Sequence, residues 1–242
     1  MKRLSAGAAS TGGCILFDHL VRGALRLTQI NRPGRPHLTS TRPRTRIQER
    51  NRSTILEAAL EVFSRESFRG ATLDQIAGEA GLSKPNLLYY FASKEAIYTE
   101  LLTRLLETWL DPLRELDPEG EPIEEIVAYV QRKLRLAREY PRESRLFANE
   151  IVQGAPRIMD RIETELRQIV DAEVGVISGW IDAGRIAAHD PLHLIISIWA
   201  TTQHYADFEV QVRALTRSEG DAHFARAEEF LTGFYRRALR PD

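Results

Sequence analysis

The chain has 242 residues, and its 33 Lys and Arg against 34 Asp and Glu give a formal net charge of -1. A hydrophobic content of 43% and a charged content of 28% are those of a globular protein with a sizeable core, which excludes a disordered or fibrous chain. The single cysteine, Cys14, excludes an internal disulfide, and no run of about 18 apolar residues occurs. We therefore expect a cytoplasmic protein without a membrane span.

The charges are divided unevenly along the chain. Residues 1–94 hold 15 Lys and Arg against 7 Asp and Glu, whereas residues 95–242 hold 18 against 27. A basic N-terminal third on an acidic body favours a polyanionic partner for that third alone. A basic disordered tail without a partner is the alternative.

Residues 1–45 are rich in Gly, Ser, Thr, Arg and Pro, and the stretch NRPGRPHLTSTRPRTR has no periodic apolar face. This composition is typical of a flexible arm. From about Arg46 onward, apolar residues recur at helical spacing, with a first break at Phe68-Arg69-Gly70. A later stripe ends at Trp109, in a long helix that we expect to stop near Asp111-Pro112.

The C-terminal half consists of helix-patterned segments between breaks. These breaks fall at residues 117–122, Tyr140-Pro141, Gly154-Ala155-Pro156, Gly184 and Asp190-Pro191. Asp190 is a suitable N-cap with Pro191 at the first helical position. No segment alternates with the period of a strand, so the sequence predicts an all-α protein of about nine helices. The last two are expected over about 190–215 and 219–239.

The segment TLDQIAGEAGLSKPNLLYYFASKEAI, residues 72–97, predicts two short helices joined by a tight turn. Thr72 and Gln75 can form a capping box, and Gly81 can take the left-handed conformation that ends the first helix. Ser83 then caps a second helix from Lys84 to about Tyr90. In a basic region this pattern is typical of a helix-turn-helix, although a helical hairpin inside a larger bundle has the same spacing.

Several side chains of this segment suit contacts with DNA. Ser83 and Lys84 present free N–H groups and a positive charge to phosphate, and Tyr89 and Lys94 can reach the same backbone. Three further residues lie where base edges or thymine methyl groups could be met: Pro85, Asn86 and Tyr90. The arginines at 42, 44, 46, 50 and 52 favour DNA over the hairpin alternative.

The stretch GLSKPNLLYYFASKEAIY resembles the signature of the TetR family of transcriptional regulators, and the match covers residues 48–98. The resemblance implies DNA contacts at Thr72, Ser83, Lys84, Tyr89 and Lys94. Leu88 departs from the pattern, which usually has an aromatic residue there, so no contact is carried over to it.

Blocks of the C-terminal half resemble a narrower group, the Rut-type pyrimidine-utilisation regulators of the TetR family. They are ETWLDPL, EYPRESRLFANEIVQGAP and IAAHDPLHLIISIWATTQHYADF. The resemblance implies a homodimeric repressor of pyrimidine catabolism and nitrogen metabolism genes that uracil or thymine releases from a near-palindromic operator. We accordingly expect a flexible arm over 1–45, a helix-turn-helix domain over 46–92, and a ligand-binding and dimerisation domain over 93–242. No cofactor is implied.

Trp199 and Gln203 fall at i and i+4, hence on one helix face, and Trp109 ends the stripe of the long helix. If these faces meet, a cavity would have two indole walls and one carboxamide able to pair with the alternating donors and acceptors of a uracil edge. Core packing is the alternative for both indoles. With the resemblance included, the predicted ligand residues are Trp109, Trp199 and Gln203, and secondly Phe147, Tyr205 and Asp207. Trp180 is assigned to packing or an interface.

Other chemistries have little support in the sequence. His189 and His193 have i, i+4 spacing, but no third ligand accompanies them, so no metal site is predicted. An activated serine, a phosphate-binding glycine loop and a Cys/His pair are all missing, which argues against an enzyme.

Two rival functions remain. One is a TetR-type regulator for a different small or apolar effector, and the other is a ligand-independent helical protein that binds nucleic acid nonspecifically through its basic arm.

Overall fold

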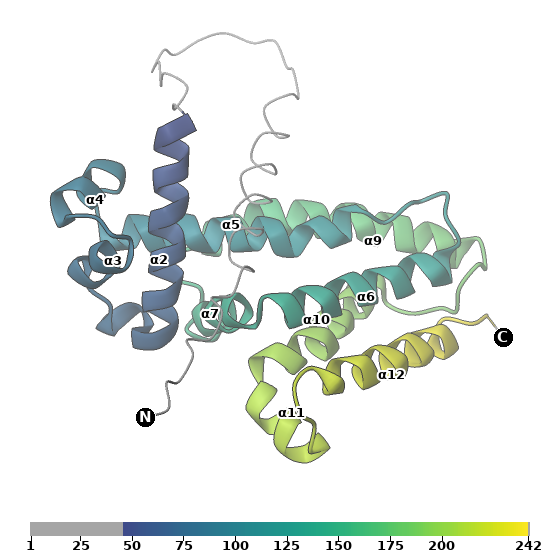
Figure 1. Ribbon diagram of the computed structural model, residues 1–242. Coiled ribbons are helices and arrows are strands. Elements are labelled where there is room, and N and C mark those ends of the chain that lie inside the picture. Colours follow the sequence, from purple (N-terminus) through teal and green to yellow (C-terminus); the bar gives the residue numbers. More distant parts are fainter. Residues whose placement is uncertain (1–45, 242) are drawn as a thin grey trace, which may run out of the picture. The chain divides into compact units, whose positions relative to one another are not determined.

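The computed structural model describes residues 46–241, which fall into two compact units divided between Arg104 and Leu105. The arm predicted over residues 1–45 lies outside the described residues. In the described part every regular element is a helix (Figure 1), which confirms the all-α prediction. Residues 46–241 form ten helices when α8, η2 and α9, which follow one another without a break, are taken as one helix. No helix between residues 46 and 241 is both long and apolar enough to span a bilayer.

The first unit contains α2 (Arg46–Gly70), α3 (Leu73–Glu79), α4 (Lys84–Tyr90) and the N-terminal half of α5 (Lys94–Arg114). The backbone of α2 is interrupted at Ser67, which has φ 59° and ψ 173°, so the break begins one residue before the predicted one. After this kink the chain continues into α3. The predicted boundary between residues 92 and 93 lies just before α5 begins.

The turn between α3 and α4 has the predicted local chemistry. Thr72 and Gln75 form the capping box of α3, and Gly81 has φ 66°. The N–H of Leu82 donates to the carbonyl of Ala77 at 2.8 Å, which closes the α3 C-terminus around the left-handed glycine. Ser83 Oγ accepts the N–H of Asn86 at 3.4 Å at the start of α4. These contacts confirm the predicted helix-turn-helix geometry.

Arg52 holds α2, α4 and α5 together inside the first unit. Its side chain is buried, donates to the carbonyl of Tyr90 at 2.6 Å and forms an ion pair with Glu100. The guanidinium also lies 4.0 Å from the centroid of the Phe91 ring. Because a backbone carbonyl, a carboxylate and a phenyl ring all contact the guanidinium, Arg52 fixes the position of α4 on α2 and α5.

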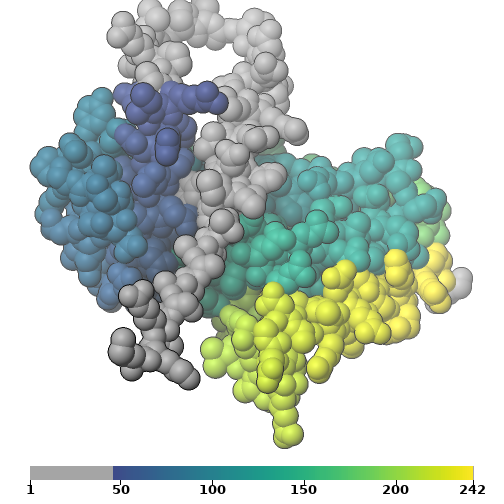
Figure 2. Space-filling view, in the orientation of Figure 1, coloured from purple at the N-terminus to yellow at the C-terminus, as the bar shows by residue number. Residues whose placement is uncertain are grey.

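The second unit contains the rest of α5 and the helices that follow it. They are α6 (Pro122–Glu139), α7 (Pro141–Val152), α8 (Met159–Arg161), η2 (Ile162–Leu166), α9 (Arg167–Asp182), α10 (Pro191–Asp207), α11 (Glu209–Thr216) and α12 (Ala222–Ala238). Helix α6 packs against α10, α12 and α7, and Figure 2 shows the side chains of α12 at the surface along those of α6. Asp190 caps α10 as predicted, since its carboxylate accepts the N–H of His193 at 2.9 Å.

Two predicted helix ends were wrong. Pro112 does not stop α5, which continues to Arg114, because a proline in the last turn removes only one hydrogen bond while Leu113 and Leu116 remain buried. The helix predicted over 190–215 is two helices. Phe208 leaves helical geometry at φ −115° and ψ 31°, and a new helix begins at Glu209.

We predict that Arg52→Met lowers the free energy of unfolding by about 2 kcal/mol. It leaves the Tyr90 carbonyl without its donor and removes one of the two arginine partners of Glu100, which keeps Arg104. Urea unfolding followed by circular dichroism measures the change. Arg65→Met is the matched control. Arg65 is half exposed and pairs with exposed Glu61 and Glu66, so its loss should cost less than about 1 kcal/mol. Equal losses in the two variants would contradict this role of Arg52.

Candidate functional site

The helix-turn-helix presents one polar face. At the start of α4, Ser83, Lys84, Pro85 and Asn86 are all exposed, whereas Leu87 is fully buried. The Lys84 ammonium lies 2.9 Å from a carboxylate oxygen of exposed Asp74. These four residues are therefore accessible to a ligand, with the free N–H groups of a helix start and a positive charge at the same place.

The two tyrosines of α4 differ in their surroundings. Tyr89 is 73% exposed, and its hydroxyl accepts a long hydrogen bond of 3.4 Å from the Gln48 side chain. Tyr90 is half-buried, and its hydroxyl accepts the Asn51 side-chain amide at 2.7 Å. Tyr89 is thus free to reach outward, while Tyr90 anchors α4 on α2.

Lys94 is used inside the first unit. Its ammonium donates to the carbonyls of Phe68 and Ala71 at 2.8 and 2.7 Å and lies 4.6 Å from the centroid of the Phe68 ring. It thereby holds the start of α5 against the chain between α2 and α3. Thr72 is exposed, but its hydroxyl is part of the α3 capping box. Phosphate contacts by these two residues remain predictions.

In the second unit, Trp199, Gln203 and Asp207 lie one helical turn apart along α10, and all three are half-buried. The Trp199 indole N–H donates to the hydroxyl of Tyr129 on α6 at 2.5 Å, and its ring packs against the core. Trp109 is 5% exposed. Since the Trp199 donor is occupied, this residue can offer a ligand its ring face but not its N–H.

Lys133 of α6 is a candidate binding residue that the sequence analysis did not predict. Its side chain is 3% exposed, and its ammonium lies 5.9 Å from the centroid of the Trp109 ring. Burial lowers the pKa of Lys133 to about 7, an effect that the charge of nearby Asp207 partly opposes. A buried ammonium is costly unless a partner compensates it, which makes this position a candidate for function.

Asp207 faces the same region from α10. Its carboxylate accepts the hydroxyl of Ser144, a buried residue of α7, at 2.6 Å. Burial raises the pKa of Asp207, whereas Ser144, Arg145 and Lys133 act in the opposite direction. Asp207 therefore makes a contact inside the second unit, one helical turn after Gln203 on α10. Helices α5, α6, α7 and α10 thus gather an indole, an ammonium and a carboxylate inside one unit.

The remaining predicted residues are half-buried or make packing contacts. Tyr205 is half-buried, and its ring centroid lies 6.2 Å from that of Phe224 on α12. Phe147 is also half-buried. Trp180 is buried and donates its indole N–H to the carbonyl of Pro118 at 2.9 Å, a packing role.

His189 Nε2 lies 2.8 Å from the carbonyl of Ala238, and residues 46–241 contain no cluster of ligands suited to a metal ion.

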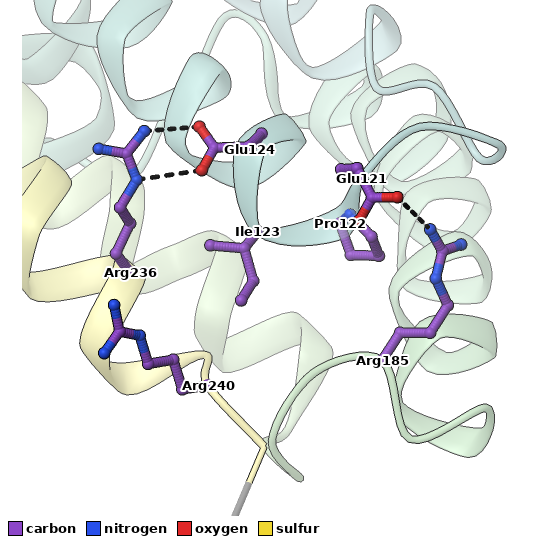
Figure 3. A pocket seen from close by; sticks show the side chains of 7 residues that line it. All are labelled: Glu121, Pro122, Ile123, Glu124, Arg185, Arg236 and Arg240. Atoms are coloured by element: carbon purple, nitrogen blue, oxygen red, sulfur yellow. Dashed lines mark hydrogen bonds and ion pairs between the residues drawn. The ribbon is translucent and has the colours of Figure 1, made fainter.

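A separate surface pocket of about 480 Å³ lies at the start of α6 (Figure 3), and no predicted ligand residue lines it. Arg236 pairs there with Glu124 at 2.5 Å, and Arg185 lies 3.8 Å from Glu121. Because two of its three arginines already have carboxylate partners and the lining is strongly charged, this pocket does not suit a small neutral ring. Lys133 does not line this pocket.

Comparisons with known proteins agree with this division into a helix-turn-helix and a helical body. The family of bacterial regulatory proteins, tetR family, matches residues 55–101, and the family described as YcdC-like protein, C-terminal region, matches residues 102–242. The chain belongs to the TetR family. The HTH-type transcriptional regulator RutR of Escherichia coli K12 is 46% identical over 177 residues, which are 73% of this chain and 84% of RutR.

Two further proteins are similar to this TetR-family chain. The HTH-type transcriptional repressor NicS of Pseudomonas putida is 31% identical over 144 residues, or 57% of this chain and 64% of NicS. The crystal structure of a TetR-like transcriptional regulator from Rhodococcus sp. RHA1 matches with a TM-score of 0.58 and 19% identity, covering 81% of this chain and 97% of that one, which shows the shared fold. The chain is accordingly a RutR-like DNA-binding transcriptional regulator of the TetR family and not an enzyme.

We predict that substitutions of Lys94 and Lys84 have different effects, the first on stability and the second on DNA binding. Lys94→Met should lower the free energy of unfolding by about 2 kcal/mol, because it leaves the carbonyls of Phe68 and Ala71 without their charged donor. Lys84→Met should change it by less than about 1 kcal/mol, because its ion pair is exposed, yet weaken binding to duplex DNA. Thermal unfolding and fluorescence anisotropy measure the two effects. A similar stability loss in both variants would speak against the assignment.

We also predict that Lys133 makes the stability of the free protein depend on pH. With a folded pKa of about 7 and an unfolded pKa of about 10.4, Lys133 is charged in the unfolded chain and largely neutral in the folded chain between these values. Its contribution to the free energy of unfolding therefore rises with pH, by about 2 kcal/mol from pH 7 to 8.5. Lys133→Met should be more stable than wild type at pH 6.5, with the gap shrinking at pH 8.5. A gap that does not change with pH in urea unfolding would refute the low pKa.

Proposed function

We propose that this regulator is a homodimeric repressor of pyrimidine catabolism and nitrogen metabolism genes, released from a near-palindromic operator by uracil or thymine. The observation that carries the proposal is the buried Lys133 ammonium of α6 beside the Trp109 ring, with the half-buried Asp207 of α10 near enough for its charge to act on it. The Rut-type blocks of the sequence support the same effector class. In the proposal, residues 93–242 bind the effector and form the dimer, and the exposed start of α4 reads DNA.

Exposed apolar side chains on two helices support the homodimer. Leu192 and Ile196 on α10 are 41% and 43% exposed, and Phe230 and Phe234 on α12 are 60% and 46% exposed. The two phenyl rings stack with their centroids 6.1 Å apart. In the proposal, α10 and α12 meet their counterparts of a second copy in a four-helix interface, which would remove this surface from water.

The proposed mechanism is an allosteric shift carried by α5. This helix contains Lys94, which is fixed in the first unit, and Trp109, which lies in the second. An effector that binds beside Trp109 stabilises one position of α5 over another. The two recognition helices of the dimer then lose the spacing that matches successive major grooves, and operator affinity falls.

A TetR-type regulator for a different effector is the second candidate. A larger apolar effector would leave the Lys133 ammonium desolvated and would offer it no hydrogen-bond acceptor, which costs binding energy. The charged groups of this region therefore favour a small polar ring over a greasy ligand.

The test combines DNA selection with effector titration. The full-length protein is used to enrich sequences from random duplexes, and the enriched duplex is then titrated with uracil or thymine in a gel-shift assay. We expect a two-half-site sequence whose complex dissociates as the pyrimidine is added. Calorimetry with Gln203→Ala should show at least tenfold weaker uracil binding. Absence of an enriched sequence would count against operator recognition, and a complex indifferent to both pyrimidines would count against the effector.

A further inference from the structure

We propose that the surface pocket at the start of α6 is a small-molecule site of its own, which binds a small organic carboxylate. Its volume of about 480 Å³ lies within the range of about 300–1,000 Å³ that is typical of small-molecule sites (Figure 3). The start of α6, the loop after α9 and the end of α12 supply its lining, which consists of three arginines, two glutamates, one proline and one isoleucine. Neither Trp109 nor Lys133 is among these residues, so the inference does not depend on the proposed effector.

The walls of the pocket are tied to the body of the second unit. The loop before α6 is held by Trp180, whose indole N–H donates to the carbonyl of Pro118 at 2.9 Å. The segment after α9 is joined to the end of α12, because the N–H of Ala187 donates to the carbonyl of buried Leu239 at 3.0 Å. Arg240 directly follows this anchored residue. The hollow is therefore formed before a ligand arrives, and binding requires little ordering of the chain.

The lining carries one positive charge more than it carries negative charges, since three arginines stand against two glutamates. Arg236 holds Glu124 through two hydrogen bonds of 3.1 and 2.5 Å. Arg185 lies 3.8 Å from Glu121. Arg240 is the guanidinium that pairs with neither carboxylate of the pocket (Figure 3). A ligand that brings one negative charge to the Arg240 side would therefore neutralise the lining.

A carboxylate fits this surplus. It carries a single negative charge at neutral pH, and its two oxygens match the paired N–H donors of a guanidinium. A cationic ligand would be repelled by the surplus charge, and a phosphate dianion would exceed that surplus and be repelled by Glu121 and Glu124. Pro122 and Ile123 add apolar surface, and Ile123 lies between the two ion pairs (Figure 3). The ligand that fits is thus a carboxylate with a small apolar part.

Benzoate and benzamide test the charge of the ligand, because both are planar and of similar size but only benzoate is an anion. In saturation-transfer NMR of the full-length wild type, benzoate should bind, and benzamide should bind at least about fivefold more weakly. Benzoate binding should also weaken as sodium chloride is added, because the charged groups of the pocket are partly exposed. Phenyl phosphate should bind no more tightly than benzoate. Equal binding of benzoate and benzamide, or tighter binding of phenyl phosphate, would overturn the carboxylate assignment.

Two substitutions should move the affinity for benzoate in opposite directions. Arg240→Met removes the surplus positive charge and should weaken binding about fivefold. Glu124→Gln removes a competing negative charge, keeps an acceptor for Arg236, and should strengthen binding about two- to fivefold. Arg167→Met is the matched control, because Arg167 is an exposed arginine of the same unit that pairs with Asp171 and does not line the pocket. Its affinity for benzoate should equal that of wild type.

Each outcome decides for or against the site. If Arg240→Met binds benzoate as tightly as wild type does, the carboxylate is not bound at this pocket and the inference fails. If Glu124→Gln binds benzoate more weakly than wild type, the charge count of the lining is the wrong explanation. Thermal unfolding of each variant checks its fold, and the comparison of benzoate with benzamide needs no variant. Because the pocket and the Lys133 region share no residue, these results and the uracil titration succeed or fail separately.

Discussion

The body of this regulator contains a buried lysine, and its desolvation is a constraint that the surrounding helices have to accommodate. Lys133 lies inside the second unit at 3% exposure, where burial lowers its pKa to about 7. Replacing it with an apolar side chain of similar length would relieve that desolvation, so packing alone gives no reason for a lysine there. A ligand that pairs with the ammonium would give such a reason. In this account a lysine occupies this buried position because it binds a ligand there.

The first unit shows the opposite use of charge. Arg52 is buried and Lys94 is half-buried, and both have partners within the unit. The arginine contacts Tyr90 and Glu100, and the lysine donates to two backbone carbonyls. Their role is to fix α4 and α5 on α2 and thereby hold the exposed start of α4 in one geometry. Rigid support is what a DNA-reading helix requires, whereas an effector site requires groups that remain free to change partners.

Local rules predicted the helix-turn-helix from sequence in detail. The Thr72 capping box, the left-handed Gly81 and the Asp190 cap all depend on neighbours within a few residues, and all are present. The predictions at Pro112 and Phe208 were wrong because tertiary packing decides whether a final turn persists and where a long helix bends.

Lys133 was missed because it stands among arginines in QRKLRLAR, which has the appearance of a solvated face. A signal was nevertheless present, since Lys133 falls three residues after Val130 and four after Tyr129, both on the buried stripe of α6. A lysine at a core position of an amphipathic helix is therefore worth marking from sequence. That Trp199 gives its N–H to Tyr129, by contrast, required the three-dimensional structure.

The central claim is that a ligand of the Lys133 region controls DNA binding by this TetR-family regulator. The most direct measurement is fluorescence anisotropy of the selected operator duplex during uracil titration, with wild type and Lys133→Met side by side. The account predicts that both proteins bind the operator with similar affinity, that uracil releases wild type, and that Lys133→Met stays bound at the same uracil concentration. Release of both proteins at the same uracil concentration would contradict it.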